Sequence, residues 1–150
     1  TAGVRYVLGA FLLVDGRTEH VYRLNGRATE LRAQGRPAEA LKHLEWAVAI
    51  NPKCQLCYKN WGDALLEVGD AQGAVEKHRV SIALAPCDAD ARHNLGVALQ
   101  RAGSLAEAAE AYRAALQFSP EDAPSWYNLG VTLGELGDPG EAAAYGEAAR

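Results

Sequence analysis

The sequence predicts an all-α protein built as a solenoid of paired helices. Three observations lead to this fold: five series of residues recur every 34 residues, apolar residues recur at helical spacing, and glycines and prolines fall where helices are expected to end. Five independent series in one register are not expected by chance. Repeats of this kind stack on their neighbours, so that together they bury a continuous core.

The five series share one register along the chain. They are Pro52, Pro86 and Pro120; Gly62, Gly96 and Gly130; Asn60, Asn94 and Asn128; Gly35, Gly69, Gly103 and Gly137; and Ala40, Ala74, Ala108 and Ala142.

Each unit is predicted to contain two helices joined by a tight turn. The glycines that begin with Gly35 follow the first helix, where a left-handed residue closes a helix at little steric cost. The prolines that begin with Pro52 end the second helix, because proline has no amide donor and clashes with the preceding turn. The Gly62 and Ala40 series are small where the helices approach closely. A larger side chain at Ala108 is expected to cost about 1–3 kcal/mol.

The register divides the chain into an N-terminal segment and a repeat domain at 21–150. The repeats are expected at 21–54, 55–88 and 89–122, with a partial unit at 123–150. Residues 1–20 lie outside the register and are expected to act as a capping or docking segment. Their apolar run at 4–14 is interpreted as a helix in preference to an extended strand, and it is expected to cover the first repeat or a partner. Neither end of the repeat array carries a clear polar cap, so both ends are expected to continue or to dock onto something else.

The repeated pattern resembles the tetratricopeptide repeat (TPR). The third unit carries it most fully, with Asn94-Leu95-Gly96 followed by Glu107-Ala108, Tyr112, Ala115 and Pro120. The resemblance implies a right-handed superhelical solenoid of helix-turn-helix repeats whose first helices line a concave groove. The asparagine series also resembles the asparagine ladder in the repeats of O-GlcNAc transferase.

Several positions depart from the family pattern. In the first unit, Arg27 and Ala28 stand where Leu and Gly are usual, so its first helix is expected to pack less tightly. In the second unit, His78 replaces the aromatic residue of the second helix and Ser81 replaces an alanine. In the fourth unit, Gly146 takes the place of that aromatic residue.

The amino-acid composition and the absence of known motifs exclude several classes of function. The chain is 49% hydrophobic and 23% charged with a formal net charge of -4, which excludes a disordered tail and argues against nucleic acid or an anionic membrane as the main partner. No apolar run reaches the roughly 20 residues of a membrane span. Phosphate loops, metalloprotease motifs, nucleophile elbows and dinucleotide fingerprints do not occur. The sequence therefore predicts a non-enzymatic protein without a cofactor or metal, in an intracellular, cytoplasmic location.

The three cysteines allow more than one interpretation. Cys54 and Cys57 form a Cys-x-x-Cys pair, and Cys87 lies near the same place one repeat later. A zinc site would need a fourth ligand, from His93 or from a partner. Redox use is disfavoured because the strand-to-helix context of thioredoxin-like motifs is missing. Ordinary reduced thiols are the preferred interpretation.

The candidate binding site follows from the resemblance, which implies which positions of each first helix point into the groove. The candidate peptide-binding residues are Asn60, Asn94, Asn128, Lys59, His93, Tyr127 and Arg101. An asparagine amide has both a donor and an acceptor, so a row of them can pair with the main chain of an extended peptide. The alternative is that each asparagine simply contacts the neighbouring helix.

These observations predict a protein–protein interaction module or scaffold whose partner is a peptide or protein. One alternative is a substrate-recruiting region of a larger enzyme, such as a glycosyltransferase. Another is an architectural subunit of a multiprotein complex. The carboxylate clamp of chaperone-binding family members is a poor match: Lys59 and Asn94 fit it, whereas Asp63, Pro124 and Asn128 occupy its other three places.

Overall fold

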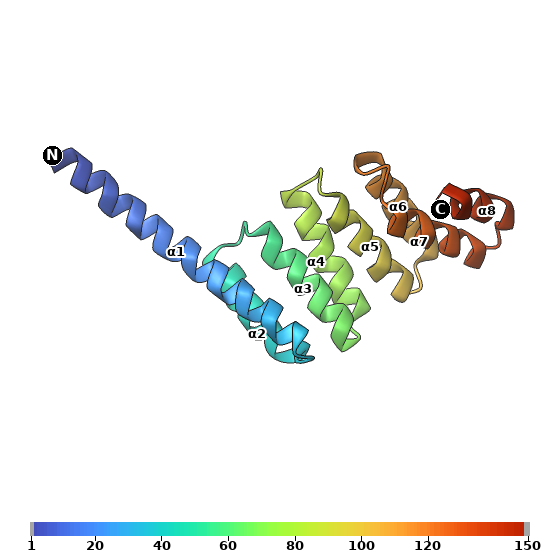
Figure 1. Cartoon of the computed structure of the whole chain (residues 1–150). Helices are drawn as coiled ribbons and strands as arrows, with labels where there is room; N and C mark the ends of the chain where they lie inside the picture. Colours follow the sequence, from blue (N-terminus) through green and yellow to red (C-terminus); the bar gives the residue numbers. More distant parts are fainter. Residues whose placement is uncertain (1, 149–150) are drawn as a thin grey trace.

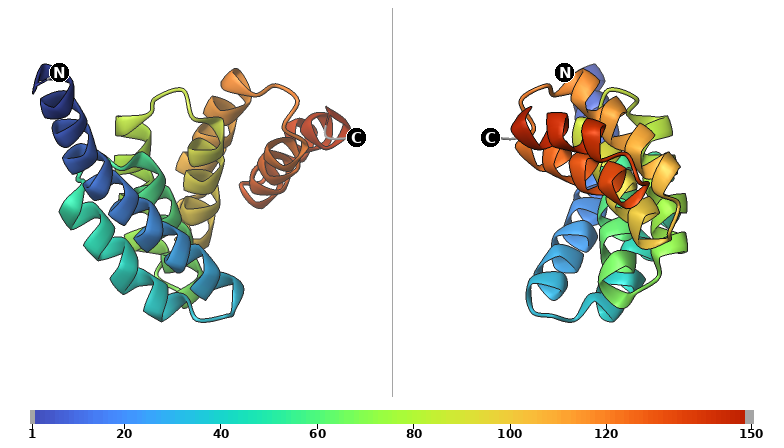
Figure 2. Two further views of the ribbon diagram at one scale, coloured as in Figure 1. Left: turned by 60° about the vertical axis from the view of Figure 1, so that its left-hand side comes forward. Right: turned by 90° about the vertical axis from the view of Figure 1, so that its right-hand side faces the viewer.

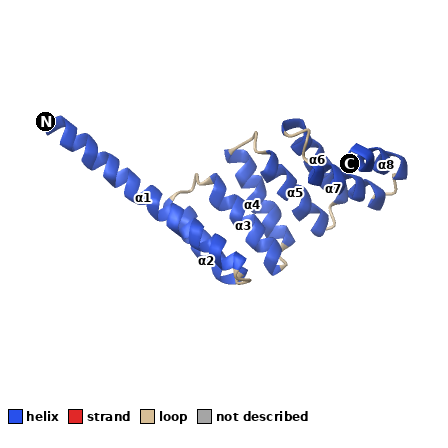
Figure 3. Ribbon diagram, in the orientation of Figure 1, coloured by secondary structure: helices blue, strands red, loops and turns tan. Residues whose placement is uncertain are grey.

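The computed structural model describes residues 2–148 and the side chains of residues 16–143 and 145. Within that range the chain forms eight α-helices and no strand (Figure 3). The helices are α1 (Ala2–Ala33), α2 (Pro37–Ile50), α3 (Gln55–Val68), α4 (Ala71–Leu84), α5 (Ala89–Arg101), α6 (Leu105–Phe118), α7 (Ala123–Glu135) and α8 (Pro139–Ala148). The all-α solenoid predicted from the 34-residue period is confirmed.

The helices pack as four consecutive pairs, in which we call α1, α3, α5 and α7 the A helices and the others the B helices. The pairs follow one another along a curved array (Figures 1 and 2). Successive A helices contact one another, whereas among the described residues the B helices make no direct backbone contact with each other. The array therefore curves with the A helices on its inner face and the B helices spread on its outer face.

Helix ends fall where the sequence predicts them. Gly35, Gly69, Gly103 and Gly137 all have positive φ, between 72° and 90°, and each closes an A helix. Helices α2, α4 and α6 each end two residues before a proline of the 34-residue series. Asp88 and Asp122 are the N-caps of α5 and α7. Their side chains accept hydrogen bonds from backbone amides in the first turn and satisfy otherwise unpaired donors.

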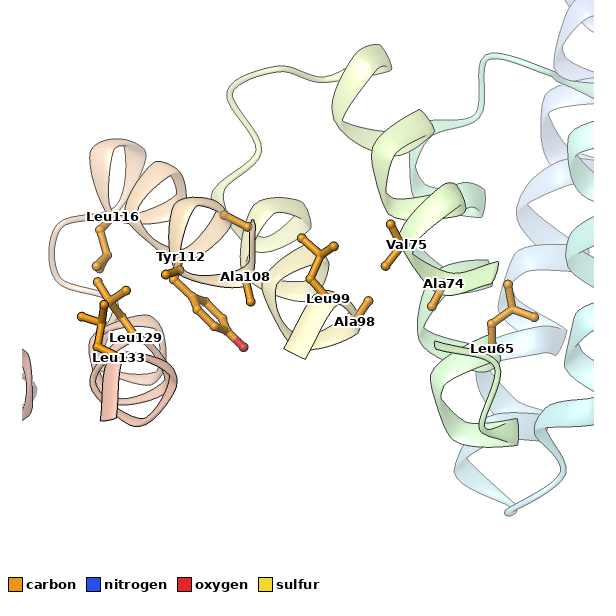
Figure 4. Close-up of a cluster of buried hydrophobic side chains, with 12 residues drawn as sticks. Leu65, Ala74, Val75, Ala98, Leu99, Ala108, Tyr112, Leu116, Leu129 and Leu133 are labelled. Carbon is orange, nitrogen blue, oxygen red and sulfur yellow. The ribbon is translucent and has the colours of Figure 1, made fainter. Parts of the chain in front are cut away.

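The core runs lengthwise through the array. Its largest cluster extends from Leu65 on α3 to Leu133 on α7, with Tyr112 fully buried near its centre (Figure 4). In the second and third units a glycine lets the two helices close on a ring, with Gly62 against His78 and Gly96 against Tyr112. A Cβ on Gly96 would lie 2.6 Å from the ring of Tyr112, so only glycine fits this contact.

Residues 2–33 form one continuous helix, so the N-terminal segment is helical and residue 20 marks no break in secondary structure. The first half of α1 extends beyond the paired helices (Figure 1). Val21, Ala28 and Leu31 on its second half are buried against α2 and α3. Ala28 is fully buried in the register place where the family usually has glycine.

Candidate functional site

The structure places all seven candidate residues on A helices, which form the inner face of the array. They are Lys59 and Asn60 on α3, His93, Asn94 and Arg101 on α5, and Tyr127 and Asn128 on α7.

Two of the three asparagines bond to the preceding A helix. Asn60 Nδ2 donates to Asn25 Oδ1 at 2.7 Å, and Asn94 Nδ2 donates to Asp63 Oδ1 at 3.0 Å. These contacts give both residues the structural role that the sequence left as the alternative. Because an amide carries two donor hydrogens and an acceptor oxygen, each bond fixes the orientation of the group and leaves it capacity for further bonds.

Asn128, the third asparagine, lies beside the buried ring of the third unit. Burial raises the pKa of the Tyr112 hydroxyl, and hydrogen bonding with the Asn128 side chain acts in the opposite direction. The same hydroxyl donates to Gln100 Oε1 at 3.1 Å. The half-buried amide of Asn128 is therefore part of a polar contact that joins α5, α6 and α7.

The candidates with ionisable side chains also join neighbouring units. Lys59 Nζ lies 3.6 Å from Asp88 and 3.8 Å from Asp90. His93 Nδ1 is 2.7 Å from Ser125 Oγ, and the guanidinium of the exposed Arg101 donates to the Leu66 carbonyl at 3.3 Å. A ligand on the inner face would therefore meet charges that are already positioned by the repeat stack.

A polar cluster that the sequence did not indicate lies between the first two units. Arg32 donates to Glu67 at 2.7 Å and lies 3.4 Å from Asp63. His78 is fully buried, and its Nε2 lies 3.5 Å from Asp63 Oδ1 without forming a hydrogen bond. Burial lowers the pKa of His78 to about 4, with the charges of Arg32 and Lys59 acting in the same direction. Burial raises the pKa of Asp63.

The signal for this cluster is present in the sequence but is spread over distant positions. Arg32 lies 31 residues before Asp63 and 35 before Glu67, so the contacts appear only when adjacent repeats are aligned with each other. His78 was visible as a departure from the aromatic pattern, but its surroundings were not.

Large apolar side chains are exposed on the A helices, between these polar groups. Tyr127 on α7 is 64% exposed, and Val131 is one turn further along the same helix. Tyr22 on α1 is 66% exposed, and Leu56 on α3 is 41% exposed. An inner face that alternates apolar side chains with oriented amides and charges is suited to a polypeptide ligand, which presents both kinds of group.

The cysteine expectation is wrong for the Cys-x-x-Cys pair. Cys54 and Cys57 form a disulfide, whereas Cys87 is a free, exposed thiol. Cys54 is the N-cap of α3, in register with Asp88 and Asp122, and its Sγ accepts the Cys57 amide at 3.2 Å. Cys57 lies one helical turn later, so the helix itself brings the two side chains together.

The disulfide also bears on the cellular compartment that the cysteines indicate. Disulfides persist mainly in oxidising environments, so these residues give no support to the expectation of a reducing compartment. Among the side chains that the structure describes, no three His, Cys, Asp or Glu residues are grouped to hold a metal ion. Over the same part of the chain, no helix is long and apolar enough to cross a membrane.

Known proteins share this architecture. The crystal structure of MamA superposes with a TM-score of 0.83 over 91% of this chain and 80% of its own, at 23% identity. MamA 41-end from Desulfovibrio magneticus RS-1 gives 0.82 over 86% and 73%, at 22% identity. The first TPR of Spaghetti (RPAP3) bound to the HSP90 peptide SRMEEVD gives 0.76 over 79% and 97%, at 18% identity. At these identities the likeness shows the fold.

Sequence comparisons point the same way. Protein FlbA of Caulobacter vibrioides is 33% identical over 78 residues, which are 52% of this chain but only 13% of FlbA. The family model described as Tetratricopeptide repeat matches residues 25–86, and the one described as TPR repeat matches residues 101–137. The two matches cover most of the repeat array that the structure shows. This chain belongs to the tetratricopeptide-repeat family.

Proposed function

We propose that this chain is a non-catalytic protein-interaction module that binds an extended segment of a partner polypeptide on its inner face. The observation that carries the proposal is the composition of that face. Exposed Tyr127 and Val131 stand beside the asparagine series, whose amides at Asn60 and Asn94 are held in fixed orientations by cross-helix bonds. Groups that are already oriented lose less conformational entropy when a ligand binds.

The binding energy is divided between two kinds of contact. Burying Tyr127 and Val131 under a ligand supplies the apolar contribution, at about 25 cal/mol per Å² removed from water. Each amide bond to the ligand main chain adds about 0.5–1.5 kcal/mol net and is independent of the ligand's side chains. The asparagine ladder is therefore proposed to select for extended backbone, while the apolar positions select for sequence.

The comparison with RPAP3 supports a peptide ligand, because that protein uses the same fold to bind an HSP90 peptide. Recognition of a C-terminal carboxylate by the clamp of chaperone-binding members is not proposed here. Lys59 is paired with Asp88 and Asp90, and Asn94 donates to Asp63, so the two matching residues already have partners within the chain.

The test is selection from a random peptide library displayed on phage, followed by binding measurements with the selected peptides. Tyr127→Ala with Val131→Ala is expected to weaken binding at least tenfold. Val80→Ala, a matched exposed valine on the outer helix α4, is expected to leave it unchanged. Replacing single peptide amides of the ligand with esters removes main-chain donors, and this change is expected to weaken binding where the donors meet the asparagine series.

Two results would contradict the proposal. One is a library from which no peptide is enriched. The other is a set of peptides whose affinity is the same for the wild type and the Tyr127→Ala, Val131→Ala variant. Asn60 and Asn94 are unsuitable as first substitutions because both stabilise the repeat stack. Asn128→Ala is the informative asparagine variant, and circular dichroism must first show that the variant is folded.

A second candidate is an architectural subunit in a larger assembly, with residues 1–20 as the docking segment. The observation that favours it is the extension of α1 beyond the paired helices (Figure 1). Deleting residues 1–20 is then expected to abolish assembly while leaving the thermal unfolding of the repeats nearly unchanged. If the truncated chain still assembles, the docking role is wrong.

A further inference from the structure

A hollow of about 480 Å³ opens on the outer face of the array, between α4, α5 and α6. Leu95 and Leu99 of α5 and Ala111 of α6 form its apolar floor, and Arg79, Arg92 and Glu107 stand around it. It lies on the opposite side of the array from the inner face, where the B helices spread apart. It is therefore separate from the peptide site proposed above.

The preceding repeat fills the same place with its own side chains. One unit earlier, the register positions of Arg92, Leu95 and Ala111 are occupied by Tyr58, Trp61 and Lys77. The rings of Tyr58 and Trp61 stack with centroids 6.3 Å apart, and Lys77 Nζ lies 4.3 Å from the centre of the Trp61 ring. Two rings and an alkyl chain thus occupy the space that Leu95 and Ala111 leave open.

The following repeat also fills this place with aromatic rings. One unit later, Trp126 stands in register with Arg92 and Tyr145 in register with Ala111. Their rings stack with centroids 5.4 Å apart. An aromatic pair therefore occupies this position in both neighbouring units, although different register positions supply the rings.

The polar contacts around the hollow recur around the equivalent place of the fourth unit, and together we call them the polar frame. Arg79 pairs with Glu107 at 2.8 Å, and one unit later Arg113 pairs with Glu141 at 2.7 Å. Arg92 Nη2 donates to the Pro86 carbonyl at 2.6 Å, just as Trp126 Nε1 donates to the Pro120 carbonyl at 2.7 Å. The third unit keeps this frame and lacks the rings.

The charges around the hollow also favour an aromatic occupant. The Arg92 guanidinium lies 5.0 Å from the centre of the Phe118 ring, so it already packs on an aromatic face. A guanidinium stacks on aromatic rings and gains cation–π energy that an aliphatic side chain does not supply. The Arg79–Glu107 pair at the outer edge is exposed, so the hollow opens to solvent.

We propose that this hollow is a second binding site, which accepts a tryptophan or tyrosine side chain presented by a partner polypeptide. The incoming ring takes the place that Trp61 and Tyr145 occupy in the flanking units. The ring packs on Leu95, Leu99 and Ala111, beside the guanidinium of Arg92. The site supplies specificity for one aromatic anchor, and the inner face holds extended chain.

The test is a titration of isotope-labelled protein with N-acetyl-tryptophanamide, followed by nuclear magnetic resonance. We expect saturable shifts at Leu95, Leu99 and Ala111, and at least tenfold weaker binding of N-acetyl-leucinamide. Leu95→Trp and Ala111→Tyr restore the residues of the flanking units and are expected to abolish binding without lowering Tm. Ala83→Tyr adds a ring at an exposed position of α4 outside the hollow and is the matched control, expected to bind normally.

Other outcomes would overturn the assignment. Equal binding of the leucine and tryptophan compounds, or unchanged binding to both filled variants, would show that the hollow does not select a ring. Tighter binding of free indole than of N-acetyl-tryptophanamide would remove the case for a ring presented by a polypeptide. The Tyr127→Ala variant is expected to keep the shifts at Leu95, so failure of the inner-face proposal and failure of this one are distinguishable.

Discussion

Gly62 lies directly against the imidazole of His78, and a Cβ on residue 62 would come to 2.5 Å from two atoms of that ring. The same contact occurs one unit later between Gly96 and Tyr112. The glycine-to-ring packing of the two units is thus equivalent, but the hydrogen bonding of the two buried rings differs. Tyr112 has a hydrogen-bond partner for its hydroxyl, whereas the two ring nitrogens of His78 have none among the described side chains.

His78→Tyr is expected to reduce the loss of stability in acid. Because the pKa of His78 is lowered to about 4 in the folded protein, the unfolded chain binds the proton more readily. Stability is therefore lost as pH falls from about 6.5 to about 4, by about 3 kcal/mol in total. The His78→Tyr variant has no such histidine and escapes this loss. The difference between its unfolding free energy in urea and that of the wild type should therefore shift in favour of the variant from pH 7 to pH 4.5.

The control for this measurement is His43→Tyr, which makes the same exchange at a half-buried histidine on α2. The titration of Asp63 changes stability in the opposite direction as pH falls, because a carboxyl with a raised pKa gains its proton more readily in the folded state. Parallel profiles for wild type and His78→Tyr between pH 7 and 4.5 would contradict a buried neutral His78.

Gly96→Ala is expected to destabilise the protein by about 1–3 kcal/mol, because the added Cβ would overpack the buried ring of Tyr112. Gly26→Ala is the matched control on the surface of α1, where an added Cβ meets nothing within 4 Å. It should stabilise the helix by about 0.5–1 kcal/mol. Denaturant unfolding of both variants measures the difference, and a neutral Gly96→Ala would show that the helix pair is more loosely packed.

The repeat register was predictable because it depends on backbone geometry. A positive φ at Gly103 or a helix end before Pro86 is determined within a few residues, so its sequence signal is local. The roles of side chains between units were not predictable in the same way. Asn60 bonds to Asn25, 35 residues earlier, and Asn94 bonds to Asp63, 31 residues earlier, so one series uses two different partners.

The disulfide was missed for a different reason. The Cys-x-x-Cys spacing is plain in the sequence, but the strand-to-helix context of thioredoxin-like motifs does not apply to it. The relevant comparison was with Asp88 and Asp122, which show that Cys54 lies at the first turn of a helix. A helix start holds residues three apart on one side, and this geometry does not require a preceding strand.

The cysteines give a direct chemical prediction. Protein unfolded without reductant should have one reactive thiol, that of Cys87, and three after reduction. Cys87→Ser should remove the single thiol. Reduction should lower the unfolding free energy by about 2 kcal/mol, because the bond closes only a four-residue loop. Three thiols before reduction would contradict the disulfide.

Arg32→Ala should destabilise the protein more at pH 7 than at pH 4.5. At pH 7 removal of the Arg32 guanidinium leaves the half-buried carboxylate of Asp63 without this cation, at a cost of about 1–3 kcal/mol of unfolding free energy. At lower pH two effects reduce that cost. Asp63 gains a proton more readily, and His78 is charged more easily because Arg32 no longer lowers its pKa.

The comparison that isolates this effect is Arg27→Ala, which breaks an exposed pair with Glu30 on the surface of α1. Exposed pairs of this kind contribute little, so its unfolding free energy should change by less than about 0.5 kcal/mol at either pH. Equal losses for Arg32→Ala at pH 7 and pH 4.5 would mean that Arg32 acts only through its packing. A larger loss at pH 7 would mean that the charge of Arg32 acts on the coupled titration of Asp63 and His78 between the first two repeats.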